Sequence, residues 1–139
     1  MSAEVKKYPK LLVICHNILE DTNNIGKTLI SLLSGWPKDR LCQIYLRDDI
    51  PSFKYCNNYY RIIDKDILKS YFKGRKNVGC VFNSSLNNLT SKKDMSNEQT
   101  FYNLGNKRIP IVSLCRDLLW KRKSWRNDRL DKWLEEQKL

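Results

Sequence analysis

Residues 11–35 read LLVICHNILEDTNNIGKTLISLLSG, and this stretch decides the fold class. Leu11–Cys15 is a short, continuously apolar run, which is typical of a strand covered on both faces in a parallel sheet. After a polar segment, apolar residues recur at helical spacing over Ile25–Leu33. Asn23 or Asn24 can cap this helix, and Gly35 can end it. A strand, a polar loop and a helix in this order predict the first unit of an α/β domain.

The remaining sequence continues the alternation of strands and helices. Strands are expected over 41–46 and 59–63, and the short apolar run 78–82 fits either a strand or a buried loop. Helices are expected after three capping or starting residues, namely Asp64, Pro110 and Asn127.

One domain is expected over residues 1–139, because a chain of this length can bury a single core. Its fold class is α/β, a Rossmann-like three-layer domain with a mainly parallel sheet. Residues 83–106 are rich in Asn, Ser, Lys and Thr without periodicity, which predicts a flexible polar loop.

The loop from His16 to Gly26 is the leading candidate site, because ligands of α/β folds bind at the carboxyl ends of strands. His16 closes the first strand, where it fits either a hydrogen-bonded loop residue or a substrate contact. Asn23, Asn24 and Gly26 could offer backbone N–H groups to a phosphate or a sugar hydroxyl, or could serve as an ordinary helix cap.

Several kinds of site are excluded by the residues themselves. Gly26-Lys27-Thr28 would need a glycine at position 21 to form a phosphate-binding loop, and Asp21 stands there instead. One histidine and scattered cysteines do not make a zinc site, so no metal and no cofactor are expected. Asp48 and Asp49 are neighbours on an extended chain whose carboxylates would point apart, so they are interpreted as a solvated turn.

The formal net charge of +11 favours anionic partners, or else simply a soluble surface. The basic segment Lys121-Arg122-Lys123-Ser124-Trp125-Arg126 concentrates this charge around a tryptophan. Such a turn could grip nucleic acid by charge and stacking, could contact an anionic membrane, or could be a plain solvated loop.

The five cysteines form no CxxC pair, and the N-terminus lacks the layout of a signal peptide. Cys15, Cys42 and Cys115 lie in apolar runs, where cysteine packs as a small hydrophobe. These features predict a reduced, cytoplasmic chain, with peripheral membrane contact as an option raised by the basic turn.

The whole pattern resembles the N-terminal part of a GT-B glycosyltransferase of the family-four kind. The likeness is carried by Leu12-Val13-Ile14-Cys15-His16 with the later Ile25-Gly26-Lys27-Thr28, by Gln43-Ile44-Tyr45-Leu46, by Arg61-Ile62-Ile63-Asp64, by Arg116-Asp117-Leu118-Leu119-Trp120, and by Trp125-Arg126-Asn127 before Leu130-Asp131-Lys132-Trp133-Leu134.

The resemblance implies two Rossmann-like domains facing a cleft, of which this chain would be the acceptor-side one. The nucleotide-sugar would bind to a C-terminal domain, so the resemblance implies an incomplete fold, no activity from this chain alone, and a missing domain or partner chain. His16, Asn23, Asn24 and Gly26 would contact the acceptor or the donor phosphate. Arg116, together with the basic residues Lys121, Arg122, Lys123, Trp125 and Arg126, would face an anionic lipid-linked acceptor or a membrane.

A doubly wound sheet would place a further strand beside Leu11–Cys15. Without that strand, we expect Leu11–Cys15 to lie at an exposed sheet edge, which favours association. The alternative function is a non-enzymatic basic α/β module that binds a partner protein or nucleic acid. The sequence shows no paired-aromatic sheet motif of the RNA-binding kind, so nucleic acid is the less favoured partner.

Overall fold

The computed structural model describes residues 8–73, 78–86, 110–123 and 125–139. Its strands are β1 (Leu11–Cys15), β2 (Leu41–Tyr45), β3 (Asn58–Arg61) and β4 (Cys80–Asn83). Its α-helices are α1 (Asn24–Leu32), α2 (Asp64–Lys73), α4 (Pro110–Lys121) and α5 (Asp128–Gln137), and 3-10 turns cover Lys38–Arg40 and Ser84–Leu86. These bounds confirm the predicted strands and helices to within a few residues. The loop expected over 83–106 lies mostly outside the described residues.

The four strands form one open sheet in the order β1-β2-β3-β4. The first three strands are parallel, with Leu11 beside Leu41 and Cys42 beside Asn58. β4 pairs with β3 in the antiparallel direction, with Tyr60 beside Val81. The fold is therefore α/β with a mixed, mainly parallel sheet, and the run 78–82 contributes a true strand.

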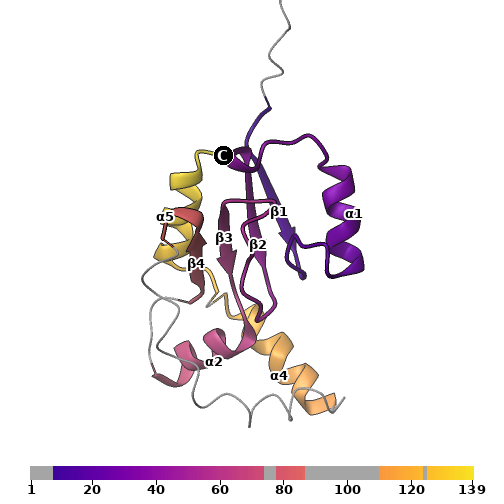
Figure 1. Cartoon of the computed structure of the whole chain (residues 1–139). Helices are drawn as coiled ribbons and strands as arrows, with labels where there is room; N and C mark the ends of the chain where they lie inside the picture. Colours follow the sequence, from indigo (N-terminus) through magenta and orange to yellow (C-terminus); the bar gives the residue numbers. More distant parts are fainter. Residues whose placement is uncertain (1–7, 74–77, 87–109, 124) are drawn as a thin grey trace, which may run out of the picture.

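α1 and α5 cover opposite faces of the sheet, as Figure 1 shows. On the α1 face, Leu29, Ile30 and Leu33 pack against a buried cluster that includes Leu41, Tyr45 and Tyr59. On the α5 face, Leu130 and Trp133 are buried with Cys42, Ile44 and Tyr60. The alternation of side chains along β2 supplies both clusters, because successive residues point to opposite faces.

The expectation that Leu11–Cys15 is a strand covered on both faces is wrong. All five residues of β2 are buried, whereas β1 is only half-buried and Ile14 is 68% exposed. The reason is the strand order: β2 has a neighbour on each side, and β1 has only β2. An apolar run thus identified the strand, but its composition did not reveal that it lies at the sheet edge. The edge position itself agrees with the expectation for a sheet that lacks a further strand beside β1.

α2 and the end of α4 lie beyond the carboxyl ends of the parallel strands (Figure 1). Asp64, the first residue of α2, joins the two helices: it accepts a hydrogen bond of 2.8 Å from the Trp120 indole N–H and pairs with Arg116 at 3.0 Å. No helix in the described ranges is long and apolar enough to span a membrane.

Candidate functional site

The loop after β1 is held in place by Gln43, a fully buried side chain in the middle of β2. Its side-chain oxygen accepts a hydrogen bond of 2.9 Å from the Leu19 backbone N–H, and its side-chain nitrogen donates to the Asn17 carbonyl oxygen at 2.8 Å. Ile18 and Leu19, which belong to the loop, are themselves buried. The loop is therefore a fixed feature at the carboxyl edge of the sheet.

His16 lies at the start of this loop, directly after β1, with its side chain exposed. Its position agrees with the predicted strand end, and its exposure leaves the imidazole accessible to a ligand. Asn17, the next residue, receives a weak hydrogen bond of 3.5 Å from Arg47, which brings a cation close to the same edge.

Asn23 and Gly26 form the cap of α1. The Asn23 side-chain oxygen accepts a hydrogen bond of 2.6 Å from the Gly26 N–H, and its side-chain nitrogen donates to the Ile18 carbonyl oxygen at 3.4 Å. A Cβ at position 26 would collide with the Glu20 carbonyl oxygen, so glycine is required for the loop to pass this close. Both residues serve the local fold, whereas Asn24 remains exposed.

Asp21, within the loop, contacts the connection between β2 and β3. Its carboxylate accepts hydrogen bonds from Lys54 at 2.7 Å and from Tyr55 at 3.0 Å. These hydrogen bonds, with that from Lys54 the stronger, lower the pKa of the Asp21 carboxyl below its usual value. A carboxylate in this place repels phosphate from this side of the loop.

The interpretation of Asp48 and Asp49 as a solvated turn is wrong for Asp48. The Asp48 carboxylate is half-buried and accepts hydrogen bonds from Arg61 at 2.7 Å and from Lys65 at 3.4 Å. Arg61 and Lys65 lie 13 and 17 positions away in the sequence, so local pattern alone could not have revealed these pairs. Asp48 is a structural link between β3, α2 and the end of β2.

Arg116 lies in the middle of α4, and the basic turn follows at the carboxyl end of this helix. Arg116 is exposed and pairs with Asp64, while Lys121, Arg122 and Lys123 are exposed. The Arg122 guanidinium lies 5.3 Å from the centre of the Tyr71 ring and donates to its hydroxyl at 3.2 Å. The basic turn therefore continues onto α2, and these cations are available to an anionic surface.

The two remaining residues of the predicted basic contact are arranged differently. Trp125 packs against the α5-face core, and its indole N–H donates to the Trp120 carbonyl oxygen at 3.2 Å. Arg126 is exposed and pairs loosely with Asp131 at 3.9 Å. Trp125 thus supports the turn from within and does not offer its ring as an external stacking platform.

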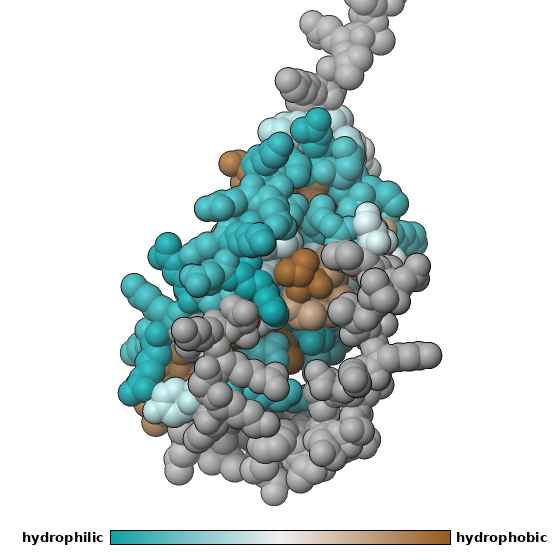
Figure 2. Space-filling view, turned by 90° about the vertical axis from the view of Figure 1, so that its left-hand side faces the viewer, coloured by the Kyte–Doolittle hydropathy of each residue, from teal (hydrophilic) through white to brown (hydrophobic). Residues whose placement is uncertain are grey.

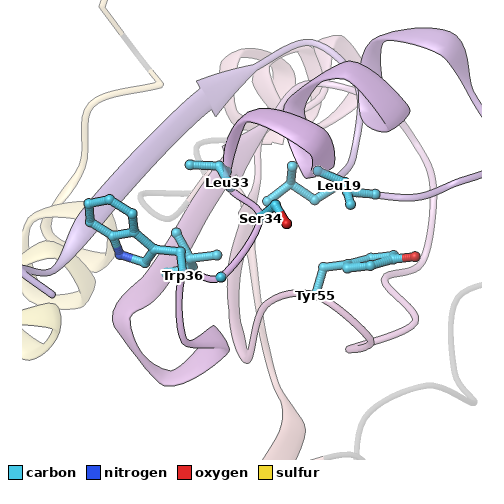
Figure 3. Close-up of a pocket in the computed structure, with 8 residues that line it drawn as sticks. Leu19, Leu33, Ser34, Trp36 and Tyr55 are labelled. Carbon is cyan, nitrogen blue, oxygen red and sulfur yellow. The ribbon is translucent and has the colours of Figure 1, made fainter. Parts of the chain in front are cut away.

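A hollow of about 240 Å³ lies on the α1 side, between the carboxyl-terminal part of α1 and Tyr55. Figure 3 shows Tyr55 facing Leu19 and Ser34 across it, with Leu33 and Trp36 on the α1 side. The lining combines apolar side chains with polar groups, and the hollow is smaller than the roughly 300–1,000 Å³ of ordinary small-molecule sites. It can hold a ring or a short hydrocarbon group, but it lacks the cations that a sugar nucleotide needs.

The described cysteines are poor nucleophiles where they are buried. Burial raises the pKa of the Cys56 thiol to about 12 and also raises those of Cys42 and Cys80. Cys15, Cys42, Cys56 and Cys80 are free thiols, and Cys115 lies among the side chains that are not described. The described residues bring no three potential metal ligands together.

Sequence reasoning missed Gln43, although a lone glutamine inside the apolar run of β2 was a usable signal. A buried amide must find hydrogen-bond partners, and here those partners are the backbone of the candidate loop. Comparison with protein-family models, with curated proteins and with solved structures finds no match to this chain.

Proposed function

We propose that this chain is the acceptor-side Rossmann-like half of a GT-B glycosyltransferase, which acts on a nucleotide-sugar donor only together with a donor-binding half. The observation that carries the proposal is the fixed loop after β1, which presents the exposed His16 at the carboxyl edge of a mainly parallel sheet whose faces are covered by α1 and α5. Such edges are where α/β folds bind their ligands.

His16 is the residue best placed to contact an acceptor hydroxyl or a donor phosphate, because it is exposed and stands on a loop that Gln43 holds still. A neutral imidazole can accept a proton from a hydroxyl group, and a protonated one can pair with phosphate. Asn24, exposed at the first position of α1, can add an amide hydrogen bond beside it.

The cations beyond the same edge suit a phosphorylated acceptor. Lys121, Arg122 and Lys123 are exposed, and Leu114 and Leu118 are exposed on the same helix at a spacing of four residues. A helix that combines exposed leucines with a basic end is suited to an anionic lipid surface. The acceptor class that fits is therefore a lipid-linked phosphate.

Affinity measurements on the purified chain test this proposal. We expect farnesyl phosphate to bind measurably, UDP-glucose to bind far more weakly, and His16→Ala to weaken farnesyl phosphate without changing the unfolding midpoint. Asn57→Ala, in the connection before β3, serves as a control substitution away from the loop.

The alternative is a non-enzymatic basic module that binds nucleic acid, and the exposed Lys121, Arg122 and Lys123 favour it. Binding of mixed-sequence RNA that falls steeply with salt, without measurable binding of farnesyl phosphate, would replace the sugar-transfer proposal. The inward position of Trp125 argues against base stacking in this turn.

A further inference from the structure

The hollow beside Tyr55 is bounded by side chains that the rest of the fold holds in place. Tyr55 forms one wall, and its hydroxyl donates to the Asp21 carboxylate at 3.0 Å. The Lys54 ammonium lies 5.0 Å from the centre of the Tyr55 ring. Figure 3 shows the Tyr55 hydroxyl on the side of the ring away from Ser34. The ring of Tyr55, and not its polar tip, therefore borders the hollow.

The residues on either side of Tyr55 keep this wall in position. Phe53 packs edge-to-face against the buried Tyr59, with the ring centres 5.7 Å apart. Cys56 is fully buried, and its thiol donates to the Leu41 carbonyl oxygen at 3.1 Å. The connection between β2 and β3 is thus attached to the sheet before and after Tyr55, so the hollow is preformed.

The opposite wall is the turn that follows α1. The Trp36 backbone N–H donates to the Leu33 carbonyl oxygen at 2.9 Å, and the Trp36 indole N–H donates to the Pro9 carbonyl oxygen at 3.2 Å. These bonds fix the turn, which also contains the exposed Ser34. In Figure 3 the Ser34 hydroxyl is directed toward Tyr55. A hydroxyl that can donate and accept therefore faces an aromatic ring across the hollow.

The charges around the hollow favour an uncharged occupant. None of the described residues that line it is charged, and Leu19, Ile30 and Leu41 supply aliphatic surface. Beside Tyr55, Lys54 and Asp21 pair with each other at 2.7 Å. A charged ligand in the hollow would lose its hydration without gaining a partner of opposite charge. The described surface over α5, by contrast, is mainly hydrophilic, as Figure 2 shows.

The size of the hollow favours a single ring. Its volume is about 240 Å³, and an apolar cavity of roughly 150 Å³ is enough to hold benzene. One ring with a small substituent therefore fits, whereas a larger fused system does not. An aromatic ring in this place can pack edge-to-face or offset against Tyr55, which an aliphatic group cannot do.

We propose that this hollow is a binding site for an uncharged molecule with one aromatic ring and a hydroxyl group, of the phenol class. The ring packs against Tyr55, and the hydroxyl forms a hydrogen bond with Ser34. The site contacts the loop after β1 only through Leu19 and does not include His16. The inference therefore does not depend on the sugar-transfer proposal.

The test follows methyl and amide NMR signals of the isotope-labelled full chain during titration with p-cresol. We expect saturable shifts at Leu19, Leu33 and Tyr55, with a Kd on the order of 1 mM or lower. Methylcyclohexanol has the same heavy atoms without a planar ring and should bind at least about three-fold more weakly. Phenyl phosphate, which adds negative charge, should bind at least about ten-fold more weakly.

Substitutions at Ser34 examine the position of the site. Ser34→Phe places a ring in the hollow from an exposed position and should abolish p-cresol binding. Ser31→Phe, at an exposed residue of α1 that does not line the hollow, should leave the Kd unchanged. Ser34→Ala should weaken p-cresol by about three-fold, the effect of one lost hydrogen bond, and should leave the binding of toluene unchanged.

Four results would overturn the proposal. They are the absence of saturable shifts with p-cresol, equal affinity for methylcyclohexanol, equal or tighter binding of phenyl phosphate, and unchanged p-cresol binding in a folded Ser34→Phe variant. If Ser34→Phe does not fold, nuclear Overhauser contacts decide with the unsubstituted chain. Contacts from p-cresol ring protons to the methyl groups of Leu33 and Leu41 would support the proposal, and their absence at saturation would overturn it.

Discussion

The Gln43 side-chain oxygen lies 2.9 Å from the Leu19 backbone nitrogen, so a buried amide in the sheet holds the loop that follows the first strand. Together with the bond from Gln43 to the Asn17 carbonyl oxygen, this contact fixes the loop on both sides of the buried Ile18. The candidate site is thus positioned by the sheet and does not depend on ordering by a ligand.

Gln43→Leu should destabilise the fold by about 2–4 kcal/mol, because the buried Leu19 N–H and the half-buried Asn17 carbonyl lose their partners. Denaturant unfolding measures the change. Gln137→Leu, at a buried glutamine in α5, is the matched control and should leave amide exchange at Leu19 unchanged. An equal acceleration of Leu19 exchange in both variants would show that Gln43 does not hold the loop.

Asn23→Ala should destabilise the chain by about 0.5–2 kcal/mol, the usual effect of losing a helix cap. The reason is the bond from the Gly26 N–H to the Asn23 side-chain oxygen. Asn24→Ala, at the exposed neighbouring position, should change the free energy of unfolding by less than about 0.5 kcal/mol. Equal losses in the two variants would contradict the assignment of Asn23 as the cap.

Gly26→Ala should destabilise the chain by about 1–3 kcal/mol, since the added methyl group must push the Glu20 carbonyl away from α1. Thermal unfolding measures the effect. Ser31→Ala, on the exposed side of the same helix, controls for the general effect of alanine on helix stability. A neutral Gly26→Ala would mean that the loop passes further from α1 than the structure shows.

The Asp21 carboxyl should titrate below the usual pKa of an aspartate, because Lys54 and Tyr55 donate hydrogen bonds to it. A lowered folded-state pKa contributes stability above the unfolded-state pKa, and that contribution disappears as the pH falls through the folded-state value. The groups are exposed, so the effect on stability should be small. NMR titration should show Lys54→Met raising the Asp21 pKa, while Lys38→Met leaves it in place.

The sequence alone predicted those helices and strands whose caps or apolar runs are formed by neighbouring residues. The sequence predicts Asn23 or Asn24 as one helix cap and Asn127 as another. The hydrogen bond from Gly26 identifies Asn23 as the first cap, and those from Arg129 and Leu130 confirm Asn127. The apolar runs of β1 and β2 were likewise recognisable from a few adjacent residues. These features depend on contacts within one or two turns of the chain, which is why local pattern predicts them.

The parts that were missed depend on distant partners. Asp48 was interpreted as solvated, yet Arg61 and Lys65 enclose it. The sequence around Gln43 does not indicate its hydrogen-bond partners, because they lie 24 and 26 residues away. The edge position of β1 was expected, but its burial was not: the apolar run predicted cover on both faces, whereas Ile14 is exposed because β1 has only β2 as a neighbour.

The position at which farnesyl phosphate binds decides whether the loop after β1 is a ligand site. Amide and imidazole NMR signals of the isotope-labelled chain would be followed during titration with farnesyl phosphate. Saturable shifts are expected at His16, Asn17 and Asn24, with a second group at Lys121 and Lys123. Shifts confined to Lys121–Arg126, with the His16 signals unmoved at saturation, would contradict a binding site in the loop after β1.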